Sequence, residues 1–137
     1  MSEKLKPFEW TEQLVLGVDS MDKQHHHLVN LINLLVDELN KDNSTQVKPK
    51  FETLCQFVVK HFQDEESLMQ KEGFVGVETH KVIHKQLLDK VGVFAEALNK
   101  GTLDKAALMS FLTMWLKSHI MGIDRKYGDH IKSKKAA

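Results

Sequence analysis

Apolar side chains recur at alternating steps of three and four residues along four stretches of the chain, the spacing of one face of an α-helix. The stretches run from about 19 to 40, 48 to 72, 77 to 100 and 103 to 127. Short polar or glycine-containing segments separate them, and no strand-like alternation of useful length occurs. The pattern predicts an all-α protein, an antiparallel up-and-down four-helix bundle with an N-terminal arm and a short C-terminal helical segment.

The 137 residues fit one domain with a core of its own. Residues 1–18 lack sustained periodicity but contain Phe8 and Trp10, so we expect an ordered arm whose aromatic rings pack on the bundle. The bundle should occupy about 19–128 and a tail 129–137, whose lysines we expect in a frayed, solvated end.

Charge and cysteine content exclude several classes of function. Nineteen Lys and Arg balance nineteen Asp and Glu, so no surplus of one sign favours binding to nucleic acid or anionic lipid. Cys55 is the single cysteine, which rules out a disulfide framework and suits a reducing compartment. No apolar run approaches the roughly 18 residues of a membrane span, and residues 1–4 begin no apolar leader. We therefore predict a cytoplasmic protein without a membrane span.

Imidazoles and carboxylates interrupt the apolar stripes of all four predicted helices. Burying such groups without partners costs several kcal/mol, so an apolar stripe has little reason to carry them unless they bind something. Seven of them converge at one depth of the bundle and are our candidate metal ligands, with no catalytic residue assigned: His25, His61, Glu65, His80, His84, His119 and Asp124.

Two of the helices carry ligand pairs four residues apart. Residues at this spacing differ by about 40° around the axis and about 6 Å along it, so their side chains meet. His61 and Glu65 form one pair, and His80 and His84 form the other.

The fourth helix carries a pair at a different spacing. Asp124 follows His119 by five residues, roughly 140° further round an ideal helix. Both reach one site only if the helix ends or bulges between them, and Gly122 favours such a break.

The number of candidate ligands predicts more than one ion. Seven exceed the four of a structural zinc site and the six of one octahedral ion, whereas two ions that share bridging carboxylates use all seven. Imidazole and carboxylate ligands suit Fe, Zn, Mn or Cu.

Other histidines lie off the inner face, and we expect His26, His27 and His130 to be exposed. Asp22 is expected to pair with the helix N-terminus, although a role in orienting His25 is open.

Four motifs together resemble the hemerythrin family, and most closely its stand-alone bacterial members. The resemblance covers about residues 8–128, with no departure at the seven ligand positions. The motifs that carry it are Asp22-Lys23-Gln24-His25, His61-Phe62-Gln63-Asp64-Glu65-Glu66, His80-x-x-x-His84 and His119-Ile120-x-x-x-Asp124-x-x-Tyr127.

The resemblance implies a non-haem centre of two Fe ions, Fe2+ or Fe3+, joined by an oxo or hydroxo bridge. One iron would take three histidines, and the other two histidines and an open position for O2. In this sequence the implied three-histidine set is His80, His84 and His119. The implied two-histidine set is His25 and His61, and the implied bridging carboxylates are Glu65 and Asp124.

The implied function is reversible binding of dioxygen for carriage, storage or delivery, without enzymatic turnover. Apolar walls would keep the site dry, and five residues within a turn of the ligands could supply them: Leu28, Ile32, Phe62, Trp115 and Ile120. Two alternatives stay open: a redox or stress protein that acts on O2, NO or peroxide, and an oxygen sensor that works through a separate partner. A redox or oxygen-consuming protein is the partner class to consider. The Glu-x-x-His pairs of ferritin-like enzymes and the His-Glu-x-x-His of zinc hydrolases are missing.

Overall fold

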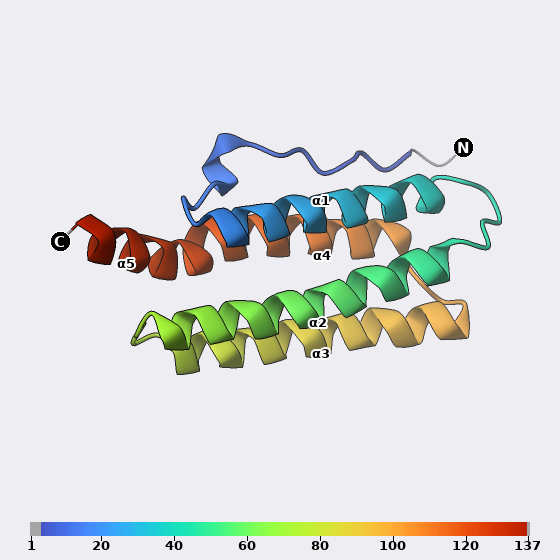
Figure 1. Cartoon of the computed structure of the whole chain (residues 1–137). Helices are drawn as coiled ribbons and strands as arrows, with labels where there is room; N and C mark the ends of the chain where they lie inside the picture. The colour runs from blue at the N-terminus through green and yellow to red at the C-terminus, as the bar shows by residue number, and fades with distance from the viewer. Residues whose placement is uncertain (1–3, 137) are drawn as a thin grey trace.

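The computed structural model describes residues 4–136 and contains helices but no strands in that range. Four long helices run up and down in an antiparallel bundle, with α1 beside α4 and α2 beside α3 (Figure 1). The predicted fold class is confirmed. The elements in chain order are η1 (Glu12–Leu14), α1 (Asp19–Leu39), α2 (Val47–Lys71), α3 (Val77–Lys100), α4 (Lys105–Ser118), the π-helical segment η2 (His119–Asp124) and α5 (Arg125–Ala136).

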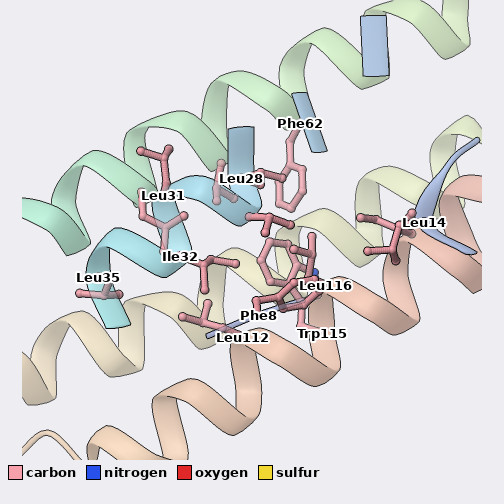
Figure 2. Close-up of a cluster of buried hydrophobic side chains, with 14 of the residues drawn as sticks. Phe8, Leu14, Leu28, Leu31, Ile32, Leu35, Phe62, Leu112, Trp115 and Leu116 are labelled. Carbon is pink, nitrogen blue, oxygen red and sulfur yellow. The ribbon is translucent and has the colours of Figure 1, made fainter. Parts of the chain in front are cut away.

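The predicted stripes form the core, but the four helices contribute unequally. Helix α1 buries almost its whole stripe, with Leu28, Ile32 and Leu35 at 0% exposure, and these side chains meet Phe8 and the inner face of α4 (Figure 2). Helix α3 by contrast fully buries only His80 and His84. Of the four neighbouring helix pairs, α3 and α4 approach each other least.

The N-terminal arm is held along α1 by two asparagines seven residues apart. Asn33 accepts from the backbone N–H of Phe8 at 2.7 Å and donates to its carbonyl at 3.0 Å. Asn40 repeats this pattern on Leu5, at 2.7 and 2.9 Å. Each amide therefore pairs with the arm as a neighbouring strand would, which satisfies backbone groups in a segment without its own ladder. The ring of Phe8 is buried, as predicted for the arm.

The helix ends follow local chemistry. Gly101 ends α3 at φ +73°, a left-handed conformation that glycine adopts without cost, and Asp104 caps α4 by accepting from the N–H of Ala107. Helix α1 has no side-chain cap at its N-terminus. Asp22 lies in the first turn of α1, as predicted, and its carboxylate also accepts from the backbone N–H groups of Leu16 and Gly17. It therefore fixes the arm against the start of the helix.

The chain beyond the fourth bundle helix is helical to Ala136, so the fraying predicted for the last lysines is wrong, although these lysines are exposed to solvent as predicted. Tyr127 and Ile131 are buried on the inner side of α5. The ammonium group of Lys134 donates to the backbone carbonyl of Glu72 at 2.9 Å and to its carboxylate at 3.1 Å. These contacts join the exposed end of the short C-terminal helix to the end of α2.

One helical stretch, Lys105–Lys135, is long and apolar enough to cross a membrane by length and composition, with a mean hydropathy of 1.2 over its most apolar 18 residues. A core helix of a bundle passes the same test, so a single such stretch is weak evidence for a span. Here the stretch contains the buried polar side chains His119 and Asp124.

Candidate metal centre

The structure brings all seven predicted ligands to one place inside the bundle, and none is more than 4% exposed. Helix α1 supplies His25 and α2 supplies His61 and Glu65, one turn apart. Helix α3 supplies its only two fully buried side chains, His80 and His84. The remaining two, His119 and Asp124, lie at the two ends of η2.

The π-helical segment explains the five-residue spacing of the last pair. A π-helix closes its hydrogen bonds five residues apart, so residues five apart share a face. The Nε2 atom of His119 lies 3.0 Å from Oδ1 of Asp124. The predicted bulge is therefore present. Gly122 is not among the described residues with a positive φ, so its backbone has a conformation that other residues also adopt. The segment therefore does not depend on glycine at this position.

Each of the two carboxylates divides its oxygens between two groups of imidazoles. Oε1 of Glu65 lies 2.9 Å from Nε2 of both His80 and His84, while Oε2 faces His61 at 3.4 Å and His25 at 3.7 Å. The carboxylate thus separates a three-histidine side from a two-histidine side.

Asp124 repeats this division from the opposite side of the cluster. Its Oδ1 lies 3.0 Å from Nε2 of both His80 and His119, and its Oδ2 lies 3.1 Å from Nε2 of His25. Two overlapping donor sets result, and they share both carboxylates. The first set is Glu65, His80, His84, His119 and Asp124. The second set is His25, His61, Glu65 and Asp124.

Several donor atoms of the cluster are buried without a hydrogen-bond partner in the described part of the chain, as expected for ligands of a metal ion. Both oxygens of Asp124, both ring nitrogens of His25 and Nε2 of His119 have no well-oriented hydrogen-bond partner among the described residues, although they are buried. Metal–ligand bonds of about 2.1 Å in octahedral geometry place neighbouring ligand atoms about 3.0 Å apart. The separations of 2.9–3.1 Å between donor atoms match this spacing. The cluster has the donor atoms and the spacing that a metal site requires.

The electrostatics of the metal-free cluster depend on the two carboxylates. Burial lowers the pKa of His25, but the carboxylates of Asp124 and Glu65 next to its ring more than offset this and raise the pKa to about 9. Burial likewise opposes the charge on His119, whose pKa is nevertheless raised to about 9, mainly by Asp124. Burial dominates at His61 and lowers its pKa to about 4. The carboxylates stay ionised because the surrounding imidazoles hold the pKa of Glu65 well below its usual range, despite burial.

Three further residues support the site, and we assigned them no role from the sequence although the motifs contain them. Oε1 of Gln24 accepts from Nδ1 of His61 at 2.6 Å, and Gln24 in turn donates to Asp64. Glu66 accepts from Nδ1 of His84 at 2.8 Å. With Nδ1 of each ring donating outwards, Nε2 is free to bind metal. Adjacency to ligands in the sequence is the signal that could have identified Gln24 and Glu66.

The third is Tyr127, whose hydroxyl donates to Oε2 of Glu65 at 2.7 Å in the fully buried site. Burial and the neighbouring carboxylates raise the pKa of this phenol, so it remains a hydrogen-bond donor. The tyrosine reaches the site because η2 and α5 continue the fourth bundle helix.

The histidines outside the cluster follow the helical geometry, with one difference. His26 and His27 are exposed, as predicted, and His26 stacks on Trp10 of the arm with ring centroids 3.5 Å apart. His130 is half-buried rather than exposed, because its Nε2 contacts the carbonyl of Glu72 at 2.9 Å and its ring packs near Phe74.

Comparison with known families agrees with this geometry. Residues 16–131 match the family model described as Hemerythrin HHE cation binding domain. The chain belongs to the hemerythrin family. This hemerythrin match spans every residue of the metal cluster.

Individual relatives are similar over nearly the whole hemerythrin fold. A bacteriohemerythrin of Stenotrophomonas maltophilia is 27% identical, over 90% of this chain and 81% of its own length. One of Methylococcus capsulatus is 32% identical (87% and 92%), and a hemerythrin-like protein of Naegleria gruberi is 33% identical (88% and 91%). Among solved structures, the crystal structure of a hemerythrin point mutant matches with a TM-score of 0.84 at 26% identity, covering 92% of this chain and 98% of that one.

Glu66→Gln should weaken metal binding about 10- to 100-fold, the usual effect of losing a carboxylate that orients a ligating histidine. The variant keeps the shape of the side chain but removes the charge that Nδ1 of His84 contacts. A competitive titration with a metal-binding dye measures the change. Glu52→Gln, on the exposed side of the same helix, is the matched control. Equal affinities of the two variants would contradict the role given to Glu66.

Proposed function

We propose that the chain binds dioxygen reversibly at a di-iron centre held by the seven clustered residues. One iron would be held on the three-histidine side and a second on the two-histidine side, with Glu65 and Asp124 shared between the two sets of ligands. The family resemblance implies an oxo or hydroxo bridge in addition. When bound, the pair of irons supplies the two electrons that reversible uptake of dioxygen requires. The proposal rests mainly on one observation: two donor sets that share both carboxylates but differ by one imidazole, which leaves the two-histidine side with a position for an exogenous ligand.

The residues around the cluster support binding rather than turnover. Phe62 stacks on His84 with ring centroids 3.7 Å apart, and Leu28, Ile32 and Ile120 are fully buried in the apolar core. These side chains exclude water, which would otherwise hydrate a charged form of the bound dioxygen and release it. Tyr127 is held by Glu65 and keeps its proton. A cytoplasmic location belongs to the same proposal.

The decisive experiment is anaerobic reduction of the iron-loaded protein, followed by exposure to air while the visible spectrum is recorded. We expect an oxygen-dependent band that disappears when O2 is removed, at two irons per chain. Rapid and irreversible conversion to a ferric spectrum, with release of superoxide or peroxide, would instead support the alternative of a redox or stress protein.

Metal loading should release protons at neutral pH and become tighter as the pH rises towards 9. The metal-free protein carries protons on His25 and His119, whose pKa values are raised to about 9, and a metal ion binds only the neutral imidazole. Affinity therefore falls as the pH drops below 9, because protons compete for the ligands. Titration with metal in weakly buffered indicator solution should show more protons released per chain at pH 7 than at pH 10, where these imidazoles are already neutral. Loading without proton release at pH 7 would contradict these assignments.

A further inference from the structure

The two sides of the metal centre orient a histidine through chemically different groups. Glu66 accepts from Nδ1 of His84 at 2.8 Å, whereas Oε1 of Gln24 accepts from Nδ1 of His61 at 2.6 Å. A carboxylate has only acceptor atoms, so Glu66 keeps the proton on Nδ1 of His84 whichever oxygen faces the ring. A carboxamide has an oxygen on one side and an NH2 group on the other, so Gln24 does the same in only one of its two orientations.

The orientation of Gln24 therefore determines which nitrogen of His61 carries the proton. With Oε1 of Gln24 towards the ring, Nδ1 of His61 donates and Nε2 keeps the lone pair that binds a metal ion. With the NH2 group towards the ring, Nδ1 must accept, and the proton of the neutral imidazole lies on Nε2 instead. Oε2 of Glu65, 3.4 Å from this nitrogen, is the nearby acceptor for that proton. The reversed orientation thus blocks the ligand atom of His61.

A carboxylate on the outer side of the same helix opposes the reversed orientation. Nε2 of Gln24 donates to Oδ2 of Asp64 at 3.0 Å, and this contact joins α1 to α2. Reversing the carboxamide would place its oxygen against the carboxylate, so two acceptors would face each other without a proton between them. Lys60 donates to the same Oδ2 at 2.9 Å and holds the carboxylate from the solvent side.

We propose that Asp64 is a positioning residue for the two-histidine side of the centre, because through Gln24 it keeps Nε2 of His61 free to bind metal. The inference rests on the proposed function, in which both donor sets hold an ion, since His61 belongs to the second set alone. The three-histidine side needs no corresponding residue, because Glu66 contacts His84 directly.

Asp64→Ala should change the tautomer of His61 in the metal-free protein. A long-range proton–nitrogen correlation spectrum of histidine-labelled protein distinguishes the two neutral forms of an imidazole. We expect the form protonated on Nδ1 in the unmodified chain and a mixture of both forms in the variant. The protonation of His84 should be the same in both proteins, because its contact with Glu66 is unchanged. The side chain of Asp64 is 40% exposed, so its removal leaves the buried core intact.

The same variant should bind metal more weakly on one side of the centre. A metal ion selects the form of His61 protonated on Nδ1, so the apparent dissociation constant rises as the inverse of the fraction in that form. We expect the second Zn2+ ion to bind at least about three-fold more weakly in Asp64→Ala, measured by competition with a metal-binding dye, and the first ion to bind as before. Asp37→Ala, which removes an exposed carboxylate from α1, is the matched control.

A double variant separates the orientation of Gln24 from general support of the helix. Gln24→Glu introduces a group with acceptors only, which holds the proton on Nδ1 of His61 without help but repels the carboxylate of Asp64. In this background Asp64→Ala removes the repulsion, so the affinity for the second Zn2+ ion should stay equal or increase.

Three outcomes would each overturn the proposal. They are an unchanged His61 tautomer in Asp64→Ala, an equal loss of affinity in Asp37→Ala, and the same loss from Asp64→Ala in the Gln24→Glu background as in the unmodified chain. None of these measurements involves dioxygen, so this proposal and the proposed function can fail separately.

Discussion

Glu65→Gln will reduce metal loading from two ions per chain to at most one. Glu65, like Asp124, faces both groups of histidines, through Oε1 on the three-histidine side and Oε2 on the two-histidine side. The amide nitrogen of glutamine carries no lone pair for a metal, so one of these two connections is lost. Elemental analysis after loading and desalting gives the stoichiometry. His61→Ala should have the same effect, because His25 is then the one histidine left in the two-histidine donor set.

The expected loss of metal should depend on the seven clustered residues and not on the number of histidines. Two exposed histidines provide the control for this. His26→Ala and His27→Ala remove exposed imidazoles next to His25 in the sequence, and both variants should bind two ions per chain. If they lose metal to the same extent as Glu65→Gln, the assignment of the seven ligands is wrong.

Removing the metal should strongly destabilise the fold. Seven polar side chains would then lie buried, and both oxygens of Asp124 would have neither water nor a well-oriented donor. Two ions, each present at 100 times its dissociation constant, stabilise the folded state by about 5 kcal/mol. For a chain of this length that corresponds to a loss of about 15 °C in Tm after metal removal.

Thermal unfolding followed by circular dichroism, before and after chelation and again after metal is restored, measures this difference. Recovery of the original Tm on adding metal shows that the loss is reversible. Coincident unfolding curves of the metal-free and metal-loaded forms would contradict a structural role for the ions.

The sequence by itself determined the fold class and which residues gather in the site. Apolar residues stepping by three and four predict helices, and the steps also specify the inward face of each helix. A histidine on that face, such as His25 or His84, is placed at the bundle axis wherever the helix packs. The same periodicity correctly leaves His26 and His27 outside.

Only the tertiary structure decided how these residues are connected. The contacts of Gln24 with His61, of Glu66 with His84 and of Tyr127 with Glu65 join different helices, and helical periodicity carries no information about the register between helices. The same limit applies to the helical tail, where Lys134 reaches Glu72 across 62 residues of sequence. The open seam between α3 and α4 also depends on how closely two helices approach, which their individual stripes do not specify. Local sequence sets which side of each helix is buried, whereas packing sets what that side contacts.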